Sequence, residues 1–163
     1  MPAKEEAEKK CLAVVRVRGT VNVRGDVKDT LSMLHLLRPN HATLVPSTPT
    51  YLGMLKKAKD HLTWGEASPQ TILHLLKKRG EIEGGRKLTE AYLKKIGFSS
   101  FKKAAEELSL GRLKLKDLKG VKPVFRLHPP SKGFKKSLKK AFAEGGELGY
   151  RGELINKLIA RMI

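Results

Sequence analysis

The first eighty residues alternate between short apolar runs and helical patterns. Residues 12–17 are mostly β-branched or apolar, with Arg16 and Arg18 alternating outward near the end, so they predict a strand with one buried face. Residues 42–45 predict a second strand, and residues 61–66 predict a third, shorter one.

A helical signature follows each predicted strand. Asp26 is a candidate N-cap for a helix whose apolar positions continue at helical spacing to Leu37. Ser47-Thr48-Pro49 and Ser68-Pro69 each combine a capping hydroxyl with a proline at the first helical position. The order predicts an α/β (α+β) fold, with a three-stranded sheet and helices on one face. The pattern permits parallel strands as well as a ferredoxin-like arrangement.

The chain after residue 80 has shorter elements. Residues 89–96 and 100–108 predict two helices, and the double glycine at 145–146 predicts a turn. Residues 121–127 contain a proline and predict an edge strand. Two prolines and a glycine make residues 128–134 an extended segment, which we call the basic loop.

The last helix has an apolar stripe that predicts docking onto the rest of the protein. The stripe consists of Leu154, Ile155, Leu158, Ile159 and Met162. We therefore expect three parts: a short tail at 1–10, a βαβαβ(α) core at 11–80, and a mostly helical extension at 81–163 that carries the basic loop and the docking helix.

The charge is strongly basic throughout. The 34 lysines and arginines outnumber 16 acidic residues, for a formal net charge of +18. Residues 1–80 contribute +7 (14 basic, 7 acidic) and residues 81–163 contribute +11 (20 basic, 9 acidic). Between 112 and 140, eleven basic residues face only Asp117. Such crowding destabilises a compact chain unless a polyanion neutralises it, and the usual polyanion is a nucleic acid.

No catalytic or metal-binding constellation stands out. The five histidines lie on different predicted elements, and no nucleotide-binding glycine motif follows a strand. Cys11, the only cysteine, precedes a buried strand and is interpreted as a small apolar residue. We therefore expect no enzyme activity, no cofactor, no metal and no small-molecule substrate.

The sequence also lacks a membrane signature. No run of about 18 apolar residues is present, and the first ten residues alternate Glu and Lys without the apolar h-region of a signal peptide after them. We expect a soluble cytoplasmic protein.

Aromatic residues make up only 6% of the chain, which argues against a platform that stacks successive bases. Trp64 falls in a predicted strand and is interpreted as a core residue, whereas Phe134 and Tyr150 lie in basic or glycine-rich surroundings. We expect recognition through phosphates and the shape of a folded RNA.

Several motifs resemble one family. Residues 40–46 (Asn-His-Ala-Thr-Leu-Val-Pro) and 51–54 (Tyr-Leu-Gly-Met) resemble the second strand and helix of the L30 family of large-subunit ribosomal proteins in its archaeal form, whose eukaryotic relative is called L7. Residues 126–130, 132–134 and 144–149 resemble its C-terminal signatures. The resemblance implies a three-stranded ferredoxin-like core with the first strand in the middle, and a C-terminal extension.

The resemblance also implies a function and partners. It implies a structural, non-enzymatic constituent of the large subunit of the cytoplasmic ribosome, bound to 23S-type rRNA and neighbouring ribosomal proteins, with a position near 5S rRNA as a further expectation. It places RNA contacts at Arg18, Asn22, Arg24, Arg38, Asn40 and His41. At Leu52, where many members have arginine, this chain departs from the pattern, which shifts the contact to Lys56 and Lys57.

The later basic segments add candidates of their own. These RNA-binding candidates are Arg126, His128, Lys132, Lys135, Lys136, Tyr150 and Arg151. Three alternatives stay open: a ribosome-assembly factor of the same family, another RNA-binding protein of the same fold, and an RNA-processing enzyme that uses the same core.

Overall fold

A buried strand lies at the centre of the computed structural model, which describes residues 10–19 and 21–163. Strand β1 (Cys11–Arg16) pairs antiparallel with β2 (His41–Pro46) on one edge and with β3 (Leu62–Glu66) on the other. All six residues of β1 are buried. The three predicted strands are confirmed, with the first in the middle. The predicted tail, apart from Lys10, lies outside the described residues.

The sheet extends beyond the predicted three strands. Its order is β4-β2-β1-β3-β6-β5. Strand β4 (Phe125–Arg126) pairs antiparallel with β2, β6 (Gly146–Tyr150) pairs parallel with β3, and β5 (Ser137–Ala141) pairs with β6. The segment after residue 80 therefore covers both outer edges of the three central strands, whose backbone groups otherwise lack partners.

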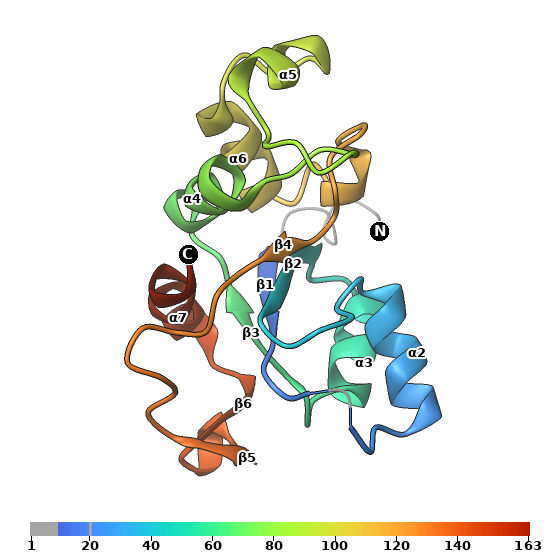
Figure 1. The fold of residues 1–163 in the computed structure, drawn as a ribbon, viewed down its shortest axis with the longest axis vertical. Helices are drawn as coiled ribbons and strands as arrows, with labels where there is room; N and C mark the ends of the chain where they lie inside the picture. Colours follow the sequence, from blue (N-terminus) through green and yellow to red (C-terminus); the bar gives the residue numbers. More distant parts are fainter. Residues whose placement is uncertain (1–9, 20) are drawn as a thin grey trace, which may run out of the picture.

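Helices cover both faces of the sheet, because β1 sends apolar side chains to each (Figure 1). Leu12 and Val14 join one apolar core with α2 (Gly25–Met33) and α3 (Pro49–Lys57). Ala13 belongs to a second core on the opposite face. The prediction of helices on only one face was wrong, since it assigned one buried face to a strand that has two.

The second core combines helices from both sides of residue 80. They are α4 (Pro69–Arg79), α5 (Glu90–Lys95), α6 (Phe101–Ser109) and α7 (Ile155–Met162). The apolar stripe of α7 docks into this core, as predicted, although Leu154 just before the helix stays 44% exposed. One continuous core thus joins the extension to the central strands.

Four helices have a side-chain hydroxyl group as N-cap, at positions where the sequence predicts that a helix begins. Each hydroxyl accepts a hydrogen bond from the backbone N–H three residues later, which satisfies a donor that the helix leaves free. These caps are Thr48, Ser68, Thr89 and Ser100.

Helix α2 differs from its prediction at both ends. Its N-cap is Arg24, and Asp26 lies in the first turn. The helix ends at Met33, and the next residues turn back, so that Leu36 is fully buried and Leu37 is 59% exposed. Extending the helical spacing to Leu37 was wrong because the chain leaves the helix one turn earlier.

A glycine in β3 provides a test of this packing. A Cβ atom at Gly65 would lie 1.8 Å from the carbonyl oxygen of Gly152, whereas at Gly53, on α3, it would meet nothing within 4 Å. We expect Gly65→Ala to lower the free energy of unfolding by about 1–3 kcal/mol. Gly53→Ala, the matched control, should raise it by about 0.5–1 kcal/mol, since alanine favours helix. Denaturant unfolding measures both, and equal effects would contradict this packing.

Candidate nucleic-acid interface

Basic side chains from several loops meet where β1 ends. Because β2 and β3 run antiparallel to β1, both begin at this end: Val15 pairs with Ala42 and Arg16 with Leu62. On the next strand, Arg126 pairs with His41. We call this region the basic end of the sheet and define it by Arg18, Arg38, Asn40, His41, His61 and Arg126.

Asparagines shape two of the loops at this end. The N–H of Asn40 donates to the carbonyl of Arg16 (2.8 Å), and the carbonyl of Asn40 accepts from the N–H of Leu127 (3.1 Å). Asn40 has a φ of +67° and Asn22 a φ of +58°, which asparagine adopts more readily than most residues. Both predicted RNA-binding asparagines therefore also have a local structural role.

Arg16 lies beneath the basic end and is only 4% exposed, although the sequence pattern pointed it outward. Its guanidinium group donates to the carbonyl of Leu36 (2.7 Å), to that of Arg18 (3.0 Å) and to that of Gly19 (3.2 Å). No carboxylate of the described residues pairs with it. Arg16 thus ties together two loops and adds an uncompensated positive charge. In the sequence, the only sign of this buried role is that a basic residue stands at the end of an apolar run.

Two histidines lie in this positive field. Burial and neighbouring guanidinium groups lower the pKa of His41 and of His61, so both imidazoles are neutral at neutral pH. The guanidinium groups are those of Arg126, Arg38 and Arg16 for His41, and those of Arg18 and Arg16 for His61, where Asp60 opposes them. The Nδ1 atom of each is buried without a hydrogen-bond partner among the described residues. Sequence analysis did not identify His61.

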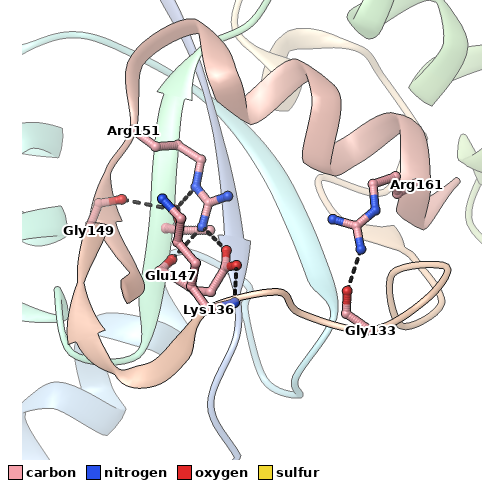
Figure 2. Close-up of polar contacts among 7 residues, drawn as sticks. Gly133, Lys136, Glu147, Gly149, Arg151 and Arg161 are labelled. Carbon is pink, nitrogen blue, oxygen red and sulfur yellow. Dashed lines mark hydrogen bonds and ion pairs between the residues drawn. The ribbon is translucent and has the colours of Figure 1, made fainter. Parts of the chain in front are cut away.

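The basic loop is held at its middle, near its C-terminal end and just beyond that end (Figure 2). Arg161 on α7 donates to the carbonyl oxygens of Ser131 (2.9 Å) and Gly133. Just beyond the loop, the N–H of Lys136 donates to a carboxylate oxygen of Glu147 (3.0 Å). The exposed lysines of this segment are therefore carried on an anchored backbone. Arg161 and Glu147 have this positioning role, which the sequence did not indicate.

Arg151 is turned inward, unlike its prediction as an RNA contact. It is 8% exposed, and its Nη2 atom donates to Glu147 Oε2 at 2.6 Å, while its Nε donates to Thr63 Oγ1 at 2.7 Å (Figure 2). Its Nη2 atom also donates to the carbonyl oxygen of Glu147, and the bond from Nε to Thr63 joins the end of β6 to β3. A lone arginine after a glycine-rich strand gives no sequence signal for such an internal pair.

His128 and Tyr150 also make internal contacts. The two ring nitrogens of His128 each lie 2.7 Å from a main-chain oxygen, of Pro129 and of Ile163. The hydroxyl of Tyr150 donates to Glu66 Oε1 at 2.5 Å. This bond, followed by burial and the nearby negative charges, raises the pKa of Tyr150 to about 12, which keeps the phenol neutral. Tyr150 as a whole residue stays 54% exposed.

Most of the other predicted RNA-binding side chains are exposed. Asn40 and His41 are half-buried. The exposed candidates are Arg18, Asn22, Arg24, Arg38, Lys56, Lys57, Arg126, Lys132, Lys135 and Lys136. Among these, Arg24 lies 3.5 Å from Asp26, and no other carboxylate of the described residues forms an ion pair with the set.

Other chemistry has little support in the described part of the chain. Within residues 10–19 and 21–163, no three His, Cys, Asp or Glu side chains are grouped to hold a metal ion, and no helix is long and apolar enough to cross a membrane. Burial raises the pKa of the Cys11 thiol to about 12, which makes it a poor nucleophile.

A compact α/β fold with a cluster of largely unpaired cations at one end is typical of small proteins that bind nucleic acids. The sequence model of the family described as Ribosomal protein L30p/L7e matches residues 12–62, from β1 to the beginning of β3. This match covers the strands and loops that form most of the basic end.

Relatives extend the similarity along most of the chain. Large ribosomal subunit protein uL30 of Nanoarchaeum equitans is 53% identical over 152 residues, which cover 93% of this chain and 97% of the relative. The proteins of the same name from Korarchaeum cryptofilum and Thermofilum pendens are 50% and 48% identical, and cover 93% and 92% of this chain and 94% and 97% of the relatives. The chain belongs to the L30p/L7e family of ribosomal proteins, which confirms the resemblance seen in its motifs.

The lowered pKa values of the two histidines predict a pH dependence of stability. The unfolded chain binds more protons than the folded one near pH 6, so the stabilisation is complete above the unfolded pKa of about 6.5 and is lost as the pH falls through the folded values. We expect the double variant His41→Gln/His61→Gln to show a flatter decline in unfolding free energy between about pH 7.5 and 5.5. His74→Gln, at an exposed position on α4, is the control. An unchanged decline in the double variant would contradict this assignment.

The buried ion pair predicts a second effect on stability. Glu147→Gln removes the charge that compensates Arg151, and side chains on both sides of the pair are 6% exposed. We expect a loss of about 3–5 kcal/mol in unfolding free energy, together with faster amide exchange at Lys136. The exposed Glu153→Gln serves as control. A loss below about 1 kcal/mol would show that the pair contributes little.

Proposed function

We propose that this protein is a structural constituent of the large ribosomal subunit and binds 23S-type rRNA through the basic end of the sheet and the basic loop. The observation that carries the proposal is the similarity to large-subunit proteins over more than nine-tenths of the chain. The protein acts in the cytoplasmic ribosome and is not an enzyme.

The charge distribution supports RNA as the partner. Arg18, Arg38 and Arg126 extend from different loops, yet meet around the end of β1 and lack ion-pair partners among the described carboxylates. Phosphates placed here replace mutual repulsion by attraction and release counterions. Contacts of this kind fix the position of the protein on a folded RNA rather than read its sequence.

The proposed RNA contacts are those candidate side chains that are exposed or half-buried. They are Arg18, Asn22, Arg24, Arg38, Asn40, His41, Lys56, Lys57, Arg126, Lys132, Lys135, Lys136 and Tyr150. Both ring nitrogens of His128, and Nε and Nη2 of Arg151, are bonded internally, so in this proposal these residues position the basic loop and β6 instead of contacting phosphates.

Two of the three predicted parts of the chain contribute to RNA binding in this proposal. Residues 11–80 supply most of the basic end, and residues 81–163 supply Arg126, the basic loop and the surface of α5 and α6. We assign that helical surface to neighbouring large-subunit proteins. A position near 5S rRNA remains part of the proposal as an expectation from the family resemblance.

Salt dependence tests the RNA contacts. The logarithm of affinity for a large-subunit rRNA transcript should fall with the logarithm of salt concentration by about 0.7–0.9 per phosphate contact. Arg126→Ala and Arg38→Ala, both at exposed side chains, should each weaken binding and make the slope shallower by about one. Lys95→Ala, exposed on α5, is the matched control. Equal losses in all three variants, or a slope near zero, would overturn the assignment of this surface.

Fractionation of ribosomes tests the structural role. We expect the protein at one copy per large subunit in translating ribosomes after a high-salt wash. Its presence only in precursor particles would make it an assembly factor, and turnover of labelled rRNA precursor by the pure protein would make it an enzyme.

A further inference from the structure

An apolar groove lies on the α3 side of the sheet, apart from the basic end. Its volume is about 330 Å³. Leu12 and Trp64 come from β1 and β3, Leu52 from α3, and Tyr150 from the end of β6. The groove exists because β3 pairs with β6, which widens the sheet beyond the area that α2 and α3 cover.

The polar groups of this groove favour an anionic occupant. Lys10, Lys56 and Ser47 line it together with a single carboxylate, that of Glu66. The hydroxyl of Tyr150 donates to that carboxylate at 2.5 Å, so one of its oxygens is already engaged. Both lysines are exposed, and no described carboxylate forms an ion pair with either. The groove thus combines an apolar, aromatic interior with two available ammonium groups.

The rings in the groove are held in place. Trp64 is 7% exposed and packs within the apolar core that faces α2 and α3, and it is the register partner of Tyr150 on β6. The bond to Glu66 fixes the tip of Tyr150. A planar group that enters the groove therefore meets aromatic surfaces that are already ordered, so little side-chain entropy is lost on contact.

We propose that this groove binds one unstacked nucleobase of the rRNA, with the phosphates of that nucleotide against Lys10 and Lys56. The inference rests on the function proposed above and extends it from phosphate contacts to a base contact. The volume of the groove is at the lower end of the roughly 300–1,000 Å³ typical of sites for small organic ligands. Proteins commonly recognise bases splayed out of RNA loops by stacking them on aromatic side chains. The low aromatic content excludes a long stacking platform but not a single site.

Fluorescence of Trp64 tests the proposal directly, because it is the only tryptophan in the chain. We expect a large-subunit rRNA transcript to quench this fluorescence at saturating concentration. Inorganic polyphosphate, which has the charge but no bases, is the control and should bind with little quenching. Equal quenching by both polymers would mean that the signal reports charge alone and would overturn the proposal.

Variants of Tyr150 provide a second, independent measurement. Tyr150→Ala should weaken binding to the transcript by roughly 5- to 150-fold, the effect expected for loss of one stacked base. Tyr150→Phe keeps the ring, loses only the bond to Glu66, and should bind within a few-fold of wild type. Both changes are at a half-exposed side chain, and thermal unfolding verifies that the variants fold.

The outcomes separate this inference from the proposed function. Salt-dependent rRNA binding without quenching of Trp64, or with wild-type affinity in Tyr150→Ala, overturns the base-binding site and leaves the ribosomal role intact; an apolar side chain of a protein neighbour is then the occupant. Absence of salt-dependent rRNA binding overturns the proposed function itself.

Discussion

Strand β1 has no exposed residue, so both its edges and both its faces need partners. The antiparallel strands β2 and β3 supply the edges, and two separate apolar cores supply the faces. The same arrangement brings the loops together. Since both neighbours run opposite to β1, the loop that leaves β1 and the loops that enter β2 and β3 meet at the end marked by Arg16. The enclosure of one strand therefore determines where the cations gather.

Burial of charge gives this protein two different kinds of interior arginine. Arg151 has a carboxylate partner, Glu147, and its further bond to Thr63 joins β6 to β3. Arg16 has only carbonyl oxygens, whose dipoles offset part of the cost of burying its charge but leave the net charge unbalanced. One arginine is thus balanced within the fold, whereas the other adds to a field that an external anion must balance. Such an electrostatic imbalance is tolerable in a protein that resides on a polyanion.

Local signals explain why parts of the fold could be predicted from the sequence. Ser68 followed by Pro69, and the apolar run that forms β1, depend on neighbours in the chain, and both were confirmed. Long-range contacts explain the failures. The double glycine read as a turn does contain one at Gly145, with φ of +86°, but Gly146 begins β6, which pairs with β3 through Trp64 and Tyr150. Nothing near Gly146 in the sequence indicates that pairing with a strand so far away in the chain.

The same limit applies to the surface. Counting charges correctly located a basic segment, yet a count does not distinguish an arginine that faces solvent from Arg151, which contacts Thr63, 88 residues away in the chain. Nor did helical spacing reveal that Leu36, rather than Leu37, is the buried leucine after α2. These choices are made by tertiary packing, which a single sequence records only indirectly.

The anchored backbone of the basic loop has a consequence for the thermodynamics of assembly. A lysine-rich segment that is disordered before binding loses conformational entropy when it meets RNA, and this loss reduces its affinity. Here Arg161 and Glu147 restrict the segment during folding, so much of that entropy is lost before the encounter. In the RNA-binding role proposed above, association then resembles the docking of a rigid body guided by long-range electrostatic attraction, with a rate that depends on ionic strength more than on rearrangement of the loop.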